Sequence, residues 1–141
     1  MKQKIDYLTV CYKNYELISL QISNFKKLFG KEFNLIIVDN TPTADKLENF
    51  FDKILSDNEN IIVVNKYSDI QFDGISHGSA IDFGIKHCKN QIICVFDSDF
   101  LFLYKDLNNY IQNLFQSGYV AVGCEFNDGT YDSVKYMDMY P

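Results

Sequence analysis

The sequence lacks a hydrophobic segment long enough to cross a membrane. Its apolar runs are short, and none approaches the ~20 consecutive apolar residues that a membrane-spanning helix needs. The first residues, MKQKID, reach an acidic side chain before the apolar core of a signal peptide could form. We therefore expect a cytoplasmic protein without a transmembrane segment. Attachment to the inner face of a membrane would require a partner or a further region.

Basic residues are also scarce. The chain has 13 Lys and Arg against 19 Asp and Glu, which gives a formal net charge of -6, and its basic residues do not cluster. Surfaces that bind nucleic acids neutralise phosphates with Lys and Arg, so this balance argues against a nucleic-acid partner. An acidic protein that binds a polyphosphate must recruit cations. The charge therefore favours a metal ion at any such site.

The 4 cysteines form no C-x-x-C pair. Three of them, Cys11, Cys94 and Cys124, lie in apolar runs that are typical of strands. We interpret the cysteines as buried thiols that pack as small hydrophobic groups, in preference to zinc ligands or disulfides. This usage is typical of a reducing compartment.

Short apolar runs alternate with segments of helical spacing along the chain. With 141 residues and 47% apolar residues, the sequence predicts one domain with a hydrophobic core. Unbroken apolar strands separated by helices are typical of an α/β fold, in which helices cover both faces of a mostly parallel sheet. The expected strands are residues 7–11, 35–38, 61–64, 92–96 and 119–124.

The expected helices lie between these strands. The first should begin after Asn14 as its cap and end before Gly30. The second should begin after Thr41-Pro42-Thr43, and the third after a cap at Ser76. The apolar positions that define the four helices are Ile18, Ile22, Phe25 and Phe29; Leu47, Phe50, Phe51, Ile54 and Leu55; Ile81, Ile85 and Cys88; and Leu107, Tyr110, Ile111, Leu114 and Phe115.

The most informative motif is Asp97-Ser98-Asp99, which directly follows the apolar run 92–96. A strand that ends in two carboxylates places them at the edge where open α/β sheets bind ligands. Neighbouring carboxylates repel each other, and a divalent cation held by oxygen atoms relieves that repulsion. The motif therefore predicts a metal-bridged phosphate ligand. The apolar run 100–103 that follows should hold the acidic turn between two buried segments.

Two common nucleotide-binding patterns are missing. The first turn, residues 11–15, has no G-x-G-x-x-G, and no P-loop occurs anywhere in the chain. Phosphatases with a D-x-D motif carry it after their first core strand, whereas this pair follows the fourth expected strand. We therefore consider a phosphatase of this kind a weak alternative.

Four segments follow one another in a recognisable order: residues 10–17, 34–40, 78–85 and 95–99. Together they resemble the nucleotide-binding half of family 2 glycosyltransferases with the GT-A fold, over about residues 7–103. Cys11 stands where the family usually has proline, and Asp82 where asparagine is common. The resemblance implies a Rossmann-like GT-A domain over residues 1–125. Residues 126–141 would be an irregular tail that begins a truncated acceptor-binding part.

The resemblance also implies how a nucleotide base would be read. Asp39 would accept a hydrogen bond from N3–H of uracil, so the donor would be a UDP-sugar. Guanine also carries a ring N–H beside an amine, so a GDP-sugar is the alternative. Backbone groups of Cys11 and Tyr12 would line the other side of the base, with the Tyr12 ring available for stacking. The competing interpretation of Asp39 is a turn or helix-capping residue.

The remaining implied roles concern the diphosphate. Asp97 and Asp99 would hold Mn²⁺ or Mg²⁺, Asp97 and Ser98 would face the nucleotide, and Gly78 would lie near the diphosphate or the sugar at a helix start. The ion would stabilise the departing nucleoside diphosphate. His77 is interpreted as a surface loop residue and His87 as a helix-end residue, and neither is given a role in the mechanism.

The catalytic base of this family lies far beyond the D-x-D motif. The tail offers Glu125, Asp128 and Asp132 as candidates, yet none lies in a family motif, so we expect the base outside this chain. The acceptor, whether glycan, lipid or protein, is not identifiable from the sequence. Two other interpretations remain open: a non-catalytic module that binds nucleotide sugars, and a nucleotidyltransferase.

Overall fold

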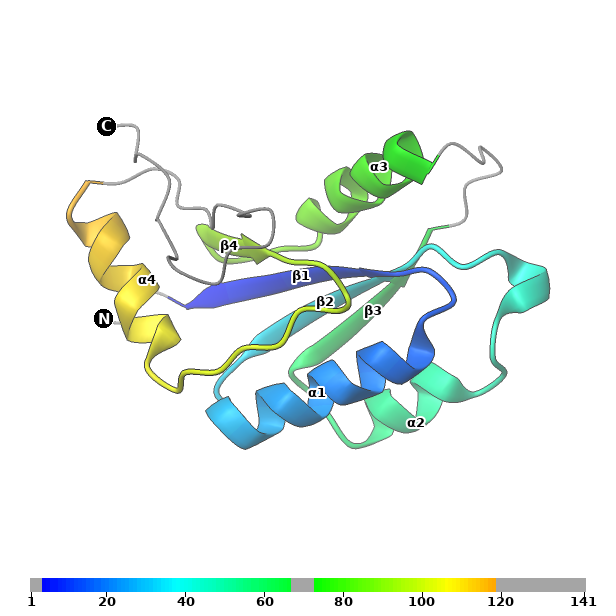
Figure 1. Cartoon of the computed structure of the whole chain (residues 1–141), viewed down its shortest axis with the longest axis horizontal. Coiled ribbons are helices and arrows are strands. Elements are labelled where there is room, and N and C mark those ends of the chain that lie inside the picture. The colour runs from blue at the N-terminus through cyan, green and yellow to red at the C-terminus, as the bar shows by residue number, and fades with distance from the viewer. Residues whose placement is uncertain (1–3, 67–72, 119–141) are drawn as a thin grey trace, which may run out of the picture. The chain divides into compact units, whose positions relative to one another are not determined.

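The computed structural model describes residues 4–66 and 73–118. Within this part of the chain, a sheet of 4 parallel strands in the order β3-β2-β1-β4 is joined by helices (Figure 1). This confirms the expected α/β fold. The elements are β1 (Ile5–Cys11), α1 (Tyr15–Phe29), β2 (Asn34–Asp39), a 3₁₀ helix (Thr43–Asp45), α2 (Phe50–Ser56), β3 (Ile61–Asn65), α3 (Asp73–Ile85), β4 (Ile92–Val95) and α4 (Leu107–Gln116).

Helices cover both faces of the sheet. Figure 1 shows α1 and α2 on one face and α3 on the other. Because side chains alternate along a strand, neighbouring residues of β1 face opposite layers. Tyr7 packs among aromatic rings on the α1 face, including Phe25 at a centroid distance of 4.8 Å and Phe102 at 5.5 Å. Leu8 belongs to the core on the α3 face, together with Val10, Ile36, Val38 and Ala80.

The helix α3 lies very close to the sheet. A Cβ atom at Gly84 would stand 2.5 Å from Cδ1 of Leu8 and 2.7 Å from Cγ2 of Val38. These distances are too short for any side chain, so glycine is what permits this approach. Ala80, one turn earlier, is fully buried. Small residues therefore fix the position of α3 on the sheet.

This packing corrects the expected third helix. It begins at Asp73, not after Ser76, and it ends at Ile85. Ile85 is 41% exposed, and Cys88 lies beyond the helix end. Of the predicted apolar residues, Ile81 and Cys88 do pack against this core, whereas Ile85 does not. The closest contacts of the helix come instead from Ala80 and Gly84.

The second helix is also shorter than expected. A 3₁₀ turn follows Pro42, and α2 starts only at Phe50. Asn49, directly before it, has a left-handed backbone with φ of 57°, a conformation that asparagine tolerates better than most residues. Leu47 is consequently 57% exposed and lies outside the helix.

The apolar run after the acidic motif is mostly on the surface, contrary to expectation. Only Phe102 is buried, whereas Phe100 is 45% and Leu103 79% exposed. The turn 97–99 is therefore not held between two buried segments. Hydrogen bonds from α1 hold it instead, as described below.

The chain divides into two compact units, with the boundary between Leu103 and Tyr104. The sheet and α1, α2 and α3 belong to the first unit, and α4 belongs to the second. The fifth strand expected at 119–124, Cys124 and the tail 126–141 lie outside the described residues, so the boundary at 125 stays a prediction. No helix in the described ranges is both long and apolar enough to cross a bilayer.

Candidate functional site

The carboxyl ends of the parallel strands meet at one edge of the sheet. Cys11 at the end of β1 is paired in register with Asp39 at the end of β2. On the other side of β1, Leu8 is paired with Val95, and the Phe96 N–H donates to the Leu8 carbonyl at 3.1 Å. The turn 97–99 therefore leaves the sheet at the same edge, which is where open α/β sheets bind ligands.

Asp39 is almost completely buried, and its orientation is fixed. Its Oδ1 accepts a hydrogen bond from the Thr41 N–H at 3.1 Å, and its Oδ2 lies 3.2 Å from the Lys46 ammonium. Lys46 also donates to Oδ1 of Asn65, at the end of β3, at 2.7 Å. The hydrogen bond from Thr41 is what the competing interpretation of Asp39, as a structural turn residue, predicts. A carboxylate has about four acceptor positions, however, so neither bond uses it up.

A hollow adjoins Asp39 on the α2 side. It lies between β3 and the segment that leads into α2, and Lys46, Asn49, Phe50 and Asn65 are among its lining residues. The hollow is therefore lined by both polar groups and aromatic rings.

Cys11 is fully buried beside Asp39. Burial and, to a smaller extent, the negative charge of Asp39 raise the pKa of the Cys11 thiol to about 12. The thiol therefore stays protonated at neutral pH and is no nucleophile. Its backbone carbonyl accepts the Asn40 N–H at 2.9 Å, so both groups of Cys11 serve the fold at this edge.

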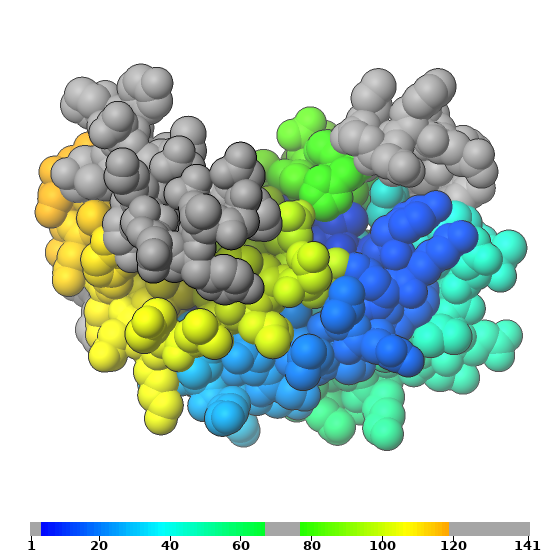
Figure 2. Space-filling model, viewed as in Figure 1, coloured from blue at the N-terminus to red at the C-terminus, as the bar shows by residue number. Residues whose placement is uncertain are grey.

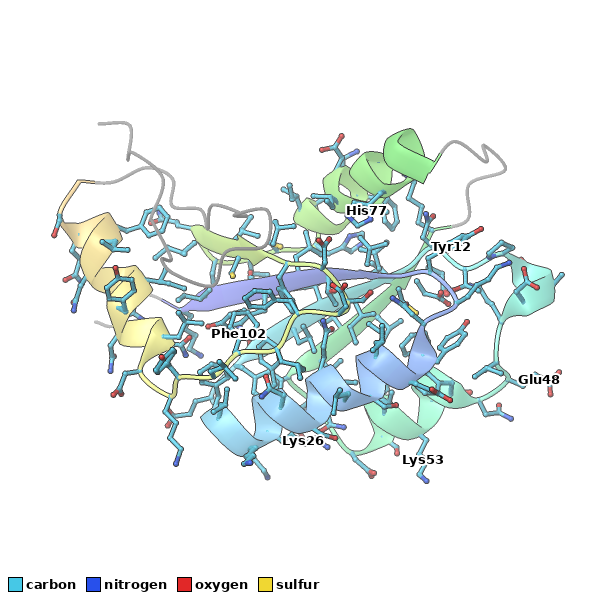
Figure 3. The ribbon with its side chains drawn as sticks, viewed as in Figure 1. Tyr12, Lys26, Glu48, Lys53, His77 and Phe102 are labelled. Atoms are coloured by element: carbon cyan, nitrogen blue, oxygen red, sulfur yellow. The ribbon has the colours of Figure 1, made fainter. Side chains whose placement is uncertain are left out.

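The turn after β1 presents an exposed ring. Tyr12 is 48% exposed, and the Lys13 ammonium lies 5.5 Å from the centre of its ring. Lys13 itself has a left-handed backbone with φ of 61°, and its N–H donates to the Thr41 hydroxyl at 3.0 Å. Figure 3 shows Tyr12 at this end of the sheet. Its ring is accessible to a base, as the stacking role requires.

Asn14 does not act as the expected side-chain cap. It precedes α1, but its side chain makes no capping hydrogen bond. Its Oδ1 accepts the Tyr12 N–H at 2.9 Å, and its Nδ2 donates to the Ser98 hydroxyl. Asn14 thus joins the turn after β1 to the acidic turn after β4, two segments that are 84 residues apart.

Two further amides of α1 hold the segment 97–102, and sequence reasoning missed both. Gln21 is buried, and its Nε2 donates to the carbonyls of Asp97 at 2.8 Å and Phe100 at 3.3 Å. Asn24 exchanges two hydrogen bonds with the Phe102 backbone, at 2.9 and 3.0 Å. Figure 2 shows this yellow-green segment lying against the blue surface of α1. The available signal was an amide, Gln21, within the apolar stripe of a helix.

The carboxylate of Asp97 is 77% exposed, and Asp99 is exposed as well. Within residues 4–66 and 73–118, no three His, Cys, Asp or Glu side chains converge as a metal cluster would need. A Mg²⁺ or Mn²⁺ ion that bridges substrate phosphates takes only one or two protein carboxylates. Two exposed carboxylates on one turn fit that kind of site.

His77 lies near this turn, which corrects its interpretation as a loop residue. It belongs to α3, and its Nε2 is 3.6 Å from Oδ1 of Asp97 (Figure 3). Gly78 follows it, and a Cβ atom there would meet nothing within 4 Å. A ligand therefore has space to approach at Gly78. Nearby, the Lys66 ammonium donates to the Ser79 hydroxyl.

An open parallel sheet with a buried acid and an acidic turn at its carboxyl edge is typical of α/β folds that bind ligands at that edge. The sequence matches the family model described as Glycosyl transferase family 2 over residues 8–140. The chain therefore belongs to this family, as its motifs predicted.

Solved structures confirm the fold as a Rossmann-like GT-A domain. The mannosyltransferase PcManGT from Pyrobaculum calidifontis, in complex with GDP-Man and Mn²⁺, has a TM-score of 0.67 and 14% identity, over 90% of this chain and 36% of that one. TarS of S. aureus, residues 1–349, has a TM-score of 0.59 and 17% identity, over 81% of this chain and 32% of that one. A second TarS structure has a TM-score of 0.63 and 12% identity, over 92% and 24% of the two chains.

The chain thus spans 36% of the mannosyltransferase and 32% and 24% of the two TarS structures. Identities this low establish similarity of fold alone. The sequence has no significant match among curated proteins.

Proposed function

We propose that this chain is the donor-binding part of a glycosyltransferase, one that uses a nucleoside diphosphate sugar and a divalent cation. One observation carries the proposal: the turn after β1, the buried Asp39 and the acidic turn 97–99 share one edge of the sheet. Family membership supports glycosyl transfer. The similar mannosyltransferase, which is described with GDP-Man and Mn²⁺, supports the class of ligand and the need for a metal.

In this proposal the base lies between Tyr12 and Asp39. The buried carboxylate accepts the ring N–H of uracil, beside the Lys46 ammonium that already lies 3.2 Å from its Oδ2. The base edge therefore meets both an acceptor and a donor. UDP is the ligand that we favour, with GDP as the alternative, since guanine also offers a ring N–H. Backbone groups of Cys11 complete this side.

The diphosphate lies toward the 97–99 turn. Asp97 and Asp99 would hold Mn²⁺ or Mg²⁺, with Ser98 facing the nucleotide and Gly78 leaving room for the phosphates or the sugar. When bound, the ion acts as a Lewis acid that stabilises the leaving diphosphate. Asn14 and Gln21 hold the turn in place. The acceptor, which is a glycan, a lipid or a protein, binds elsewhere, and Glu125, Asp128 and Asp132 stay candidates for the base.

Isothermal titration calorimetry tests this proposal. UDP should bind the 141-residue chain more tightly in Mn²⁺ than in EDTA, and ADP should bind more weakly than UDP. Asp99→Asn should remove most of the difference between Mn²⁺ and EDTA. Asp57→Asn is the matched control, because Asp57 is an exposed acid at the end of α2.

Two results would count against the proposal at different levels. Equal UDP affinity in Mn²⁺ and EDTA would remove the role of the metal. Failure of UDP and GDP to bind under both conditions would remove the donor site itself.

A further inference from the structure

The chain contains 2 histidines, and the structure places them in different environments. Nδ1 of His87 lies 3.0 Å from the Phe83 carbonyl, and its ring packs on Phe83 at a centroid distance of 4.9 Å. His87 is thus held by its own helical segment. His77 instead has Nε2 at 3.6 Å from Oδ1 of Asp97, which belongs to another part of the fold.

The distance of 3.6 Å is informative. It is too long for a hydrogen bond between nitrogen and oxygen, which needs about 2.7–3.2 Å. A small approach of the two side chains would let both atoms bind one ion, since a metal lies about 2.0–2.2 Å from histidine nitrogen and carboxylate oxygen.

Both groups are accessible from solvent, and the helix that carries His77 is firmly placed. The side chains of His77 and Asp97 are 45% and 77% exposed. Ala80 and Gly84 fix α3 against the sheet, as described above. The imidazole is therefore presented to the acidic turn by a rigid element, while the turn itself is held by Gln21.

We propose that His77 is a protein ligand of the divalent cation at the 97–99 turn and that its nitrogen makes the site select Mn²⁺ over Mg²⁺. The inference rests on the proposed function, since it pairs His77 with Asp97 in the metal site assigned there. Because His77, Asp97 and Asp99 do not converge as a three-ligand cluster in the described residues, diphosphate oxygens would complete the coordination. Mg²⁺ demands near-octahedral oxygen coordination and binds imidazole poorly, whereas affinity for a nitrogen-containing site rises from Mn²⁺ through Co²⁺ to Ni²⁺. A site built from carboxylates alone should show a weaker preference.

Nuclear magnetic resonance of the imidazole groups tests the ligand role directly. The wild-type chain has only two histidine signals to observe, and His77→Ala and His87→Ala assign them. With UDP present, substoichiometric Mn²⁺ should broaden the His77 imidazole signals well before those of His87. Equal broadening of both signals would contradict direct ligation.

Metal affinity tests the selectivity. Calorimetric titration with UDP present should show that His77→Ala lowers Mn²⁺ affinity at least about tenfold, lowers Mg²⁺ affinity much less, and so reduces the ratio of the two. His87→Ala should leave the ratio unchanged. Thermal melting checks that each variant is folded, which we expect for His77→Ala because the side chain is half-exposed.

The possible outcomes distinguish a failure of this inference from a failure of the proposed function on which it rests. If His77→Ala keeps the wild-type ratio of Mn²⁺ to Mg²⁺ affinity while Asp99→Asn loses metal-dependent UDP binding, His77 is not a ligand and the proposed function stands. If the wild-type chain binds neither ion, with or without UDP, both fall.

Discussion

Gln21 allows the support of the acidic turn to be tested apart from the acids themselves. The side chain is 1% exposed and donates to the carbonyls of Asp97 and Phe100. Gln21→Leu keeps the volume roughly constant and removes both hydrogen bonds. The Asp97 carbonyl still accepts the Phe100 N–H at 3.1 Å, so it keeps one partner. The perturbation is therefore local to the turn.

The size of the effect follows from these contacts. The loss of stability comes from removing two hydrogen bonds, each of which contributes about 0.5–1.5 kcal/mol. Part of it is offset, because Oε1 of Gln21 has no hydrogen-bond partner in the described ranges and leucine removes that buried atom. We expect Gln21→Leu to lower the free energy of unfolding by about 1–2 kcal/mol.

Gln21→Glu keeps nearly the same side-chain shape, and its effect on stability should depend on pH. An ionised carboxylate cannot donate to the two carbonyls, so the introduced carboxyl is stable there only when protonated, and its folded-state pKa is raised. A raised folded pKa means that stability is present below the unfolded value of about 4.3 and is lost as the pH rises. Urea unfolding at pH 5 and pH 8 should therefore separate Gln21→Glu from the wild type most strongly at pH 8.

The control is Asn24→Ala on the same helix. Asn24 bonds the Phe102 backbone, beyond the turn. It should lower stability by a similar amount yet leave Mn²⁺-dependent UDP affinity close to that of the wild type, whereas Gln21→Leu should weaken that affinity. Equal effects of the two variants on UDP affinity, or no effect of Gln21→Leu on either quantity, would refute the positioning role.

Four other substitutions test separate parts of the structure. Gly84→Ala should cost about 1–3 kcal/mol in urea unfolding, because its Cβ would clash with the sheet beneath α3, whereas Gly78→Ala should be neutral or slightly stabilising. Burial raises the pKa of Asp6, but hydrogen bonds, chiefly from residues 89–90, outweigh burial and leave the pKa lowered. The folded protein therefore loses stability as the pH falls below ~3.8 and Asp6 becomes protonated. Asp6→Asn should make this acid-induced loss of stability smaller. Asp39→Ala should weaken UDP binding more than ADP binding, as calorimetry can show.

The sheet was predictable because its signal is local. β2 and β3 are runs of Ile, Leu and Val between polar residues, and every expected strand in the described ranges lies within two residues of its observed ends. The acidic motif was predictable for the same reason: it directly follows such a run. Helix bounds were harder, since α3 contacts the sheet most closely through Ala80 and Gly84, which carry little hydrophobic signal.

The support of the site was not predictable, since it depends on contacts between distant segments. Gln21 and Asp97 are 76 residues apart, and Asn24 and Phe102 are 78 apart. Nothing near Gln21 in the sequence indicates that its amide holds a turn after the fourth strand. His77 and Asp97 likewise come together only through the packing of α3. The residue types indicated what chemistry the carboxyl edge of the sheet could support, but the fold determines which residues meet there.

Net charge proved a poor guide to local charge. The value of -6 led to the expectation that basic residues do not cluster and that a metal ion serves any polyphosphate site, yet Lys13, Lys46 and Lys66 all lie at the carboxyl edge of the sheet. Lys13 is 2.9 Å from Asp45 and Lys46 is 3.2 Å from Asp39, whereas Lys66 donates to a neutral hydroxyl. A diphosphate must compete with a carboxylate for the first two ammonium groups but not for the third. Some nucleotide affinity should therefore persist in EDTA, and the gain on adding Mn²⁺ measures the contribution of the ion beyond that of these lysines.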